Sequence, residues 1–178
     1  MALIEQYKQM HKDENLYAGS ATTLHKESIG QFISVTQSKT ILDYGCGKAV
    51  QYSKENIHND YFYGIMPSLY DPAVEQYSVL PEGKFDMVIC TDVLEHIEEH
   101  DLESVLAEIY SKAEKFVYIG ICNSPADSFL PDGRNAHVTQ KPLDWWVEQI
   151  IPHASIHTLV FVYGSDKNKA FLKNNKKI

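Results

Sequence analysis

Glycines and a carboxylate stand together at the end of the first strongly apolar segment of the chain. Asp43 lies inside that segment, residues 40–44, and Gly45, Cys46 and Gly47 follow it. Glycine lets the backbone turn sharply and come close to a ligand, and a carboxylate accepts hydrogen bonds from hydroxylated or cationic groups. Residues 43 and 45–47 are therefore predicted to form a ligand-binding turn.

Two further apolar segments also end in polar residues. Thr91 and Asp92 follow residues 85–90, and Asp71 follows a segment that ends at residue 69 or 70. The carboxyl ends of parallel strands meet at one edge of a sheet. We therefore expect Asp71, Thr91 and Asp92 to share one ligand with the glycine turn, although Asp71-Pro72 could also be a plain turn.

Two histidines are candidates for a role in chemistry or ligand binding. His137 lies in a long loop, where an imidazole could act as a general base at neutral pH or could orient the loop. His11 lies near the N-terminus with Tyr7, in a segment that could close over the ligand or form a surface helix. No histidine or cysteine spacing matches a metal-binding pattern, so we expect no metal site.

The elements that must position these residues follow from apolar periodicity and turn signals. Strands are predicted at 40–44, 85–90 and 116–122 and in a segment that ends at 69 or 70, whereas 61–66 is ambiguous. Helices are predicted around 24–33, at 48–57 and 142–151, and along the stripe Leu102, Val105, Leu106 and Ile109. Residues 156–163 and 169–172 flank a turn at 164–168, as in a terminal hairpin.

This alternation of strands and helices predicts the α/β class. We expect a doubly wound, mostly parallel sheet with a C-terminal antiparallel hairpin, and a ligand beyond the carboxyl ends of the strands. The 178 residues suit one domain, in which 1–38 form an N-terminal helical cap and 39–178 form the core. Loop 123–141 is long, and such loops are usually functional or disordered.

The overall charge of the chain is acidic. Sixteen Lys and Arg residues against 24 Asp and Glu residues give a net charge of -8, which makes nucleic acid a poor partner. The three cysteines include no CxxC pair, which fits a reducing cytoplasm. No apolar run approaches the roughly 18 residues of a membrane span, and we find no signal-peptide core. We therefore expect a cytoplasmic protein without a membrane partner, and the sequence does not indicate its oligomeric state.

Two of these segments together resemble the motifs of class I S-adenosylmethionine-dependent methyltransferases. Residues 41–49, ILDYGCGKA, are similar to the first motif of that family, with alanine in place of its usual third glycine. Residues 85–97, FDMVICTDVLEHI, are similar to its fourth-strand motif, and the resemblance covers roughly residues 7–151. It implies a Rossmann-like core and S-adenosylmethionine as the cofactor. Asp71 would then hold the ribose hydroxyls, unless Met66 occupies that position, and Thr91 and Asp92 would lie beside the sulfonium and amino acid end.

The chain is also similar to a subgroup of phage and bacterial methyltransferase-like proteins. The likeness lies in the segments DYGCGK, YDPAV, CTDVLEH and DGRNAH and in the pair Trp145-Trp146. In similar folds the loop that carries DGRNAH usually builds the acceptor pocket, and one tryptophan could line it while core packing is expected of at least one.

The resemblance implies methyl transfer to an acceptor that the sequence does not identify. A small molecule is the default acceptor and a protein side chain is possible, whereas a nucleobase is the weakest choice because no Asn/Asp-Pro-Pro-Tyr motif is present. An acceptor that must lose a proton could give it to His137 or Asp92, the predicted catalytic residues. Two alternatives are a binding module without turnover and a nucleotide-dependent oxidoreductase. Val50 disfavours the oxidoreductase because it replaces the last glycine of GxGxxG.

Overall fold

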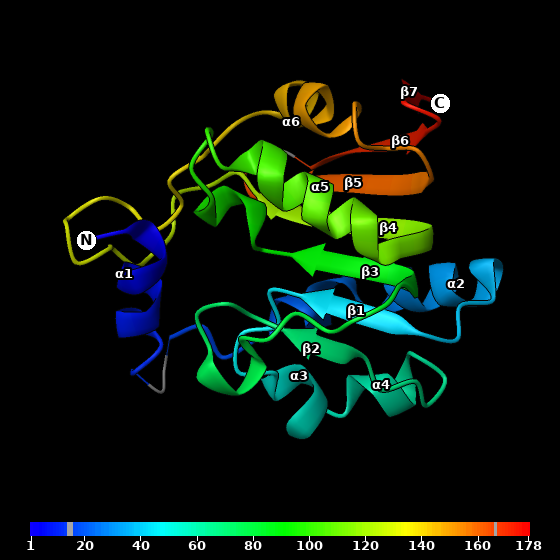
Figure 1. Cartoon of the computed structure of the whole chain (residues 1–178), viewed down its shortest axis with the longest axis horizontal. Helices are drawn as coiled ribbons and strands as arrows, with labels where there is room; N and C mark the ends of the chain where they lie inside the picture. The colour runs from blue at the N-terminus through cyan, green and yellow to red at the C-terminus, as the bar shows by residue number, and fades with distance from the viewer. Residues whose placement is uncertain (14–15, 166) are drawn as a thin grey trace.

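The computed structural model describes residues 1–13, 16–165 and 167–178. Within them, one mixed sheet has the strand order β2-β1-β3-β4-β5-β6-β7 (Figure 1). The strands are β1 Ile41–Tyr44, β2 Ser68–Tyr70, β3 Phe85–Thr91, β4 Ala113–Cys122, β5 His157–Tyr163, β6 Asn168–Lys173 and β7 Lys176–Lys177. The sheet confirms the predicted α/β class.

Strand pairing follows the predicted pattern of a parallel body with an antiparallel end. β1 pairs in parallel with β2 and β3, and the parallel pairing continues from β3 to β4 and from β4 to β5. β6 and β7 then add antiparallel strands, so the terminal hairpin is confirmed. The expected turn at 164–168 includes Asp166, which lies outside the described residues.

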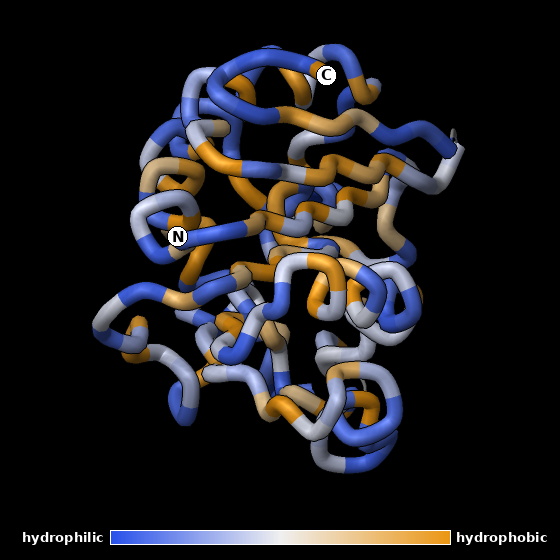
Figure 2. Tube along the Cα trace, turned by 90° about the vertical axis from the view of Figure 1, so that its right-hand side faces the viewer, coloured by the Kyte–Doolittle hydropathy of each residue, from blue (hydrophilic) through white to orange (hydrophobic). Residues whose placement is uncertain are grey.

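Helices cover both faces of the sheet. The α-helices are α1 Leu3–Met10, α2 Lys26–Thr36, α3 Val50–Ser53, α4 Ile57–Asp60, α5 Leu102–Lys112 and α6 Leu143–Ile150. Short 3-10 helices are η1 Ala21–His25, η2 Glu75–Tyr77 and η3 Leu94–His96. One buried cluster joins the sheet to α5 and α6, and a second joins it to α2, α3 and α4. The apolar parts of the chain trace accordingly gather in the central strands (Figure 2).

The sequence pattern of α5 shows why these helices form where they do. Leu102, Leu106 and Ile109 are at most 1% exposed, so the apolar stripe is the face that packs on the sheet. Trp146 in α6 is fully buried in the same cluster, whereas Trp145 is only partly buried. Neither tryptophan lines the main cavity described below. Core packing therefore accounts for Trp146.

The predicted helix over 48–57 is wrong. Only α3, four residues long, and the separate α4 form there. Ala49 and Asn56 both have left-handed backbone, with φ of 56° and 57°, and each stands immediately before one of these short helices. A left-handed residue interrupts a right-handed helix, which explains the division. Residues 61–66, ambiguous from the sequence, form no strand.

The N-terminal segment has two distinct parts. α2 is a covering helix of the sheet, because Ile29 and Ile33 are buried in the cluster that contains Ile41 and Met87. By contrast, α1 lies beyond the arrowheads of β1 and β3 in Figure 1, beside the loop that follows β4. The helix expected around residues 24–33 is thus present as α2, and α1 lies near the edge of the sheet at which the ligand was expected. No helix within the described ranges is long and apolar enough to cross a membrane.

Candidate active site

A cavity of about 730 Å³ opens at the carboxyl ends of β1 and β3. Its walls come from α1, the segment 17–24, the ends of β1, β2 and β3, and the loop after β4. This is the edge of a parallel α/β sheet at which ligands bind. The volume is within the usual range for small-molecule sites.

The glycine turn after β1 is tied to the end of β2. The amide of Gly45 donates to the carbonyl of Tyr70 at 2.7 Å, and the amide of Gly47 donates to Oδ2 of Asp71 at 2.9 Å. Both glycines have left-handed φ values, 86° and 56°, which other residues adopt at a cost. The other oxygen of Asp71, Oδ1, accepts from the amide of Ala73 at 2.9 Å. Asp71 is thereby held at the cavity wall by two backbone amides.

An N-terminal arm, residues 17–19, lies against the same turn. The amides of Lys48, Val50 and Gln51 donate to the carbonyls of residues 17, 18 and 19 at 3.0–3.3 Å. A Cβ atom on Gly19 would lie 2.1 Å from the carbonyl oxygen of Cys46, so the arm fits only as glycine. Because protein carbonyls already occupy these amides, the start of α3 does not offer them to a phosphate group.

The end of β3 places two polar residues in the cavity. The hydroxyls of Thr91 and Thr22 are hydrogen-bonded at 2.9 Å, which joins the strand to the N-terminal segment. Asp92 has left-handed backbone, with φ of 54°, and accepts a short hydrogen bond from the hydroxyl of Tyr163. Burial raises the pKa of Asp92 above its ordinary value, and the bond from Tyr163 opposes that rise.

His137, in the loop after β4, forms another part of the wall. Its Nδ1 lies 2.6 Å from the carbonyl oxygen of Ser124, which can only accept, so Nδ1 carries the proton. The other ring nitrogen, Nε2, is then the one with a lone pair when the ring is neutral. The Asn135 side chain bridges the loop, since it accepts from the amides of Ala126 and His137 and donates to the Ala126 carbonyl.

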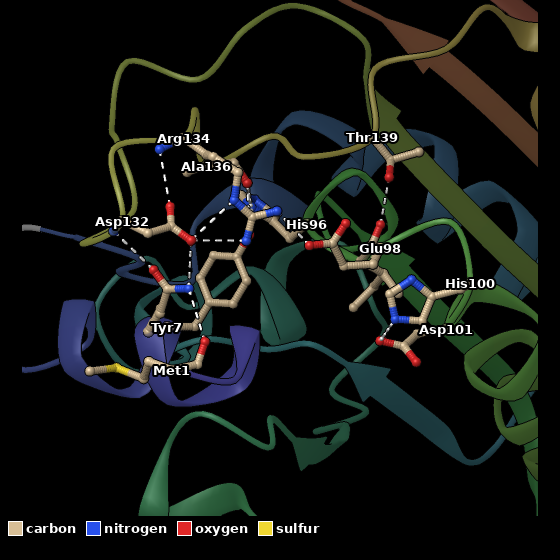
Figure 3. A network of polar contacts seen from close by, with 12 residues as sticks. Met1, Tyr7, His96, Glu98, His100, Asp101, Asp132, Arg134, Ala136 and Thr139 are labelled. Atoms are coloured by element: carbon tan, nitrogen blue, oxygen red, sulfur yellow. Dashed lines mark hydrogen bonds and ion pairs between the residues drawn. The ribbon is translucent and has the colours of Figure 1, made fainter.

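α1 and this loop both line the cavity, and Figure 3 shows the polar contacts that join them. The Tyr7 hydroxyl donates to the carbonyl of Ala136 at 2.7 Å, and Nδ1 of His96 lies 2.9 Å from the same carbonyl. The rings of His96 and His137 are 4.8 Å apart. Burial lowers the pKa of His96 to about 4, with His137 a further cause, so His96 is neutral at neutral pH. His96 therefore joins α1 to the loop.

A second set of polar contacts joins α1 to the loop and the loop to Glu98, which lies before α5. Nε2 of Gln6 donates to Oδ2 of Asp132 at 2.9 Å, and the amide of Asp132 donates back to Oε1 of Gln6 at 3.1 Å. Arg134 pairs with Asp132 at 3.0 Å and with Glu98 at 2.6 Å. Sequence reasoning missed these contacts because Gln6 and Asp132 are 126 residues apart along the chain.

The structure brings together most of the residues that the sequence singled out. The predicted residues that line the cavity are His11, Gly45, Gly47, Asp71, Thr91, Asp92 and His137. His11 has a lowered pKa because burial outweighs the opposing effect of Asp71. The Tyr17 ring lies beside it at a tilt of 34°, with ring centroids 5.0 Å apart.

Asp43 and Cys46 are not part of the cavity wall. Asp43 is buried behind the turn, where its Oδ2 accepts from the Tyr52 hydroxyl at 2.7 Å and from Nε2 of Gln51 at 3.1 Å. Burial raises the pKa of Asp43 to about 7 against these two hydrogen bonds. Cys46 is 1% exposed. Both residues therefore support the turn from inside the protein.

Glu95 is the buried acidic residue whose place the sequence did not predict. It is 0% exposed, and its Oε1 accepts from the amide of Cys122 at 2.7 Å. Its own carbonyl accepts from the amide of Thr139. Glu95 thus ties η3 to the end of β4 and to the following loop.

The charge of the cavity wall indicates which ligands it suits. Its lining includes Glu55, Asp71 and Asp92, and no lysine or arginine among the described residues. Carboxylates accept hydrogen bonds from ribose hydroxyls and attract cationic groups such as a sulfonium or an ammonium. A pyrophosphate would meet repulsion here and would find the amides of α3 already occupied. The residues fit S-adenosylmethionine and not a dinucleotide.

Comparison with known protein families supports the same cofactor. Residues 46–115 match a family model described as a methyltransferase domain. The match begins in the glycine turn and includes Gly47, Asp71, Thr91 and Asp92. No curated protein matches the chain. Over residues 46–115 the chain is therefore similar to a methyltransferase domain, built here on a mostly parallel α/β sheet, and S-adenosylmethionine is the methyl donor that such domains use.

Proposed function

We propose that the acceptor is a small molecule that is neutral or cationic where it meets the cavity. The observation that carries this proposal is the character of the wall, which has three carboxylates and no lysine or arginine in the described part of the chain. A phosphorylated or strongly acidic acceptor would meet like charge there. The net charge of -8 extends the same argument to nucleic acid.

The enclosure of the site favours a small acceptor over a protein side chain. α1 and the loop after β4 are joined by the Tyr7 hydrogen bond and by the Gln6–Asp132 pair. Ser128 and His137 of that loop line the same cavity as the glycine turn. A wall on this side of the cavity suits an acceptor small enough to enter the cavity beside the donor.

We assign cofactor contacts to the residues that line the cavity at the strand ends. Asp71 would accept hydrogen bonds from the ribose hydroxyls, since backbone amides already orient both of its oxygens. Gly45 and Gly47 would let the backbone approach the ligand. His11 would cover it from the N-terminal side, while Asp43 and Cys46 would act only by supporting the turn.

Methyl transfer depends more on the alignment of donor and acceptor than on acid or base catalysis. The donor supplies a methyl carbon that its sulfonium already activates. The chain has to hold the acceptor in line with that carbon, which removes the entropic cost of their encounter. Thr91 and Asp92 lie at the end of β3, at the centre of the sheet edge, and are placed to position the reacting groups.

An acceptor that must lose a proton has two candidate bases. Asp92 has a raised pKa because it is buried, which makes its carboxylate a stronger base than an exposed one. Nε2 of His137 carries a lone pair on the same cavity wall. Both residues are proposed to be catalytic for such an acceptor, and an acceptor that is already ionised would need neither. The narrower likeness to phage and bacterial methyltransferase-like proteins stays a prediction.

Isotope transfer tests the proposal. The full chain is incubated with methyl-labelled S-adenosylmethionine and a cell extract, which is then separated into small molecules, protein and nucleic acid. Label is expected in the small-molecule fraction, retained on a cation-exchange or neutral phase. Asp71→Asn should reduce the transfer, and Asp86→Asn, at the opposite end of β3, should not. Label in protein or nucleic acid would contradict the proposed acceptor, and no label in any fraction despite cofactor binding would favour a binding module.

A further inference from the structure

Three potential metal ligands meet at the wall of the cavity. They are Glu95 from η3, Cys122 at the end of β4 and His137 from the following loop. One ligand atom from each residue lies within 4.8 Å of the other two. Glu95 and Cys122 are 27 positions apart in the sequence, and Cys122 and His137 are 15 positions apart. The sequence therefore contains no short ligand spacing that would have predicted the cluster.

The strongest indication that a ligand binds at the cluster is an oxygen of Glu95 that has no partner within the described residues. The side chain is fully buried, and one oxygen, Oε1, is used by the amide of Cys122. The other oxygen, Oε2, has no hydrogen-bond partner in the part of the chain that the structure describes. A buried carboxylate oxygen without a partner is costly, and a bound cation removes that cost.

The His137 ring has the hydrogen bond to a backbone carbonyl that is typical of metal-binding histidines. Its Nδ1–H donates to the Ser124 carbonyl at 2.6 Å, which selects the tautomer and leaves the lone pair on Nε2. The amide of His137 is in turn bound by the Asn135 side chain at 2.9 Å. The ring is therefore oriented by a backbone carbonyl before any ligand arrives.

Asp92 adds a second carboxyl group beside the cluster. Asp92 interacts electrostatically with Glu95, Cys122 and His137. Within the described ranges, neither Asp92 nor Glu95 forms an ion pair with a lysine or an arginine. Glu95 is fully buried and Cys122 and Asp92 are partly buried, and a divalent cation would favour the ionised forms of all three groups.

We propose that Glu95, Cys122 and His137 bind a divalent transition-metal ion of the zinc class. One oxygen, one sulfur and one nitrogen ligand suit Zn²⁺ and Co²⁺, whereas Mg²⁺ and Ca²⁺ take oxygen ligands. Three protein ligands leave a fourth position open, as in catalytic zinc sites. Of the three, only His137 lines the cavity, so a fourth ligand would approach from the cavity side. This departs from the expectation from sequence that no metal binds, and it does not depend on the proposed acceptor.

Metal binding would change the role of His137. Its lone pair would be used by the ion, and Asp92 would remain as the only one of the two proposed bases. An acceptor thiol or hydroxyl that reached the open position would have its pKa lowered by the ion. The two roles of His137 are therefore alternatives that a metal titration separates.

Cobalt substitution tests the site directly. The full chain is stripped with a chelator, checked for folding by circular dichroism, and titrated with Co²⁺. We expect one Co²⁺ per chain with an intense thiolate-to-cobalt charge-transfer band, and displacement of that band by Zn²⁺. Cys122→Ser should abolish the band. Glu95→Gln, which keeps the shape of the side chain, should weaken Co²⁺ binding by more than the roughly 10–100-fold that loss of an outer contact costs.

Cys90→Ala is the matched control, because Cys90 is a fully buried thiol outside the cluster. It should keep the band at the strength of the unmodified chain. The absence of a charge-transfer band in the folded, unmodified chain would overturn the proposal, whatever the variants do. A band that persists in Cys122→Ser would overturn it as well. Binding of S-adenosylhomocysteine, measured separately, keeps this result distinct from any failure of the methyltransferase site.

Discussion

The carboxylate of Asp71 accepts a hydrogen bond of 2.9 Å from the amide of Gly47. The bond joins the end of β2 to the turn that follows β1, although 24 residues separate its partners. It holds one oxygen of the carboxylate against the turn, while the amide of Ala73 holds the other. The acidic residue and the glycine turn thus form one unit, and neither is expected to bind the cofactor well without the other.

Asp71→Asn should weaken the binding of S-adenosylhomocysteine by about 10- to 100-fold, because a hydrogen bond to a charged group contributes about 1.5–3 kcal/mol. Calorimetric titration measures the change. Asp86→Asn is the matched control, since Asp86 pairs with Lys115 at the start of β3 and does not line the cavity. Equal affinities of the two variants would contradict the role assigned to Asp71.

Gly19→Ala should destabilise the fold and the cofactor site more than Gly83→Ala. Both glycines have left-handed φ values, 74° and 81°, so alanine costs about 1–2 kcal/mol at either position. Only at position 19 would the new Cβ meet backbone, 2.1 Å from the carbonyl oxygen of Cys46, whereas at position 83 it meets nothing within 4 Å. Urea unfolding compares the two variants, and similar losses of stability would mean that the arm does not pack on the turn.

The buried carboxyl of Asp43 should make the protein less stable as pH rises. Its folded-state pKa is about 7 against an ordinary 3.8, so between these values the folded state binds a proton that the unfolded state has released. The contribution of Asp43 to the free energy of unfolding is therefore full below pH 3.8 and falls as the pH rises to about 7. Asn at this position keeps an oxygen for Tyr52 and Gln51 without the charge.

Asp43→Asn should accordingly flatten the fall in stability across that pH range and raise stability at its upper end. Urea unfolding at both ends of the range, in the presence of a chelator, gives the comparison. Asp60→Asn serves as the control because Asp60 is exposed at the end of α4. An unchanged pH slope in Asp43→Asn would show that this carboxyl is ionised throughout.

Tyr7→Phe should loosen the loop after β4. The substitution removes the donor of the 2.7 Å hydrogen bond to Ala136 and leaves the ring in place, at a cost of about 0.5–1.5 kcal/mol. Amide hydrogen exchange over residues 126–138 should become faster, while exchange in β3 should not change. Tyr63→Phe, at an exposed site away from the cavity, should leave both rates as they are. Unchanged exchange in the loop would contradict a clamp between α1 and the loop.

The sheet could be predicted from sequence because its signals are local. Residues 85–90 form an apolar run, and β3 covers them with Met87, Val88 and Ile89 fully buried. The prediction of a helix over 48–57 failed because no local signal showed that Ala49 and Asn56 would adopt left-handed backbone. At Ala49 the reason is long-range, since the arm 17–19 takes the amides with which a longer helix would begin.

The candidate site could be predicted only where its residues follow strands. Gly45, Asp71 and Thr91 each stand at a strand end, and the topology brings strand ends together. Asp43 and Cys46 were predicted to bind the ligand because the sequence of a four-residue strand and its turn does not indicate which side chains point into the protein. The partners of Glu95 and Gln6 could not be predicted, since both sets of contacts depend on how the loop after β4 folds back.

The central claim is that the glycine turn, Asp71 and the end of β3 form one site for the adenosyl cofactor. Titration calorimetry of the folded chain with S-adenosylhomocysteine tests it most directly, with NAD as the comparison ligand. The structure predicts one site per chain for S-adenosylhomocysteine and no heat of binding with NAD. Absence of binding to S-adenosylhomocysteine and to S-adenosylmethionine, in protein shown to be folded, would contradict the account.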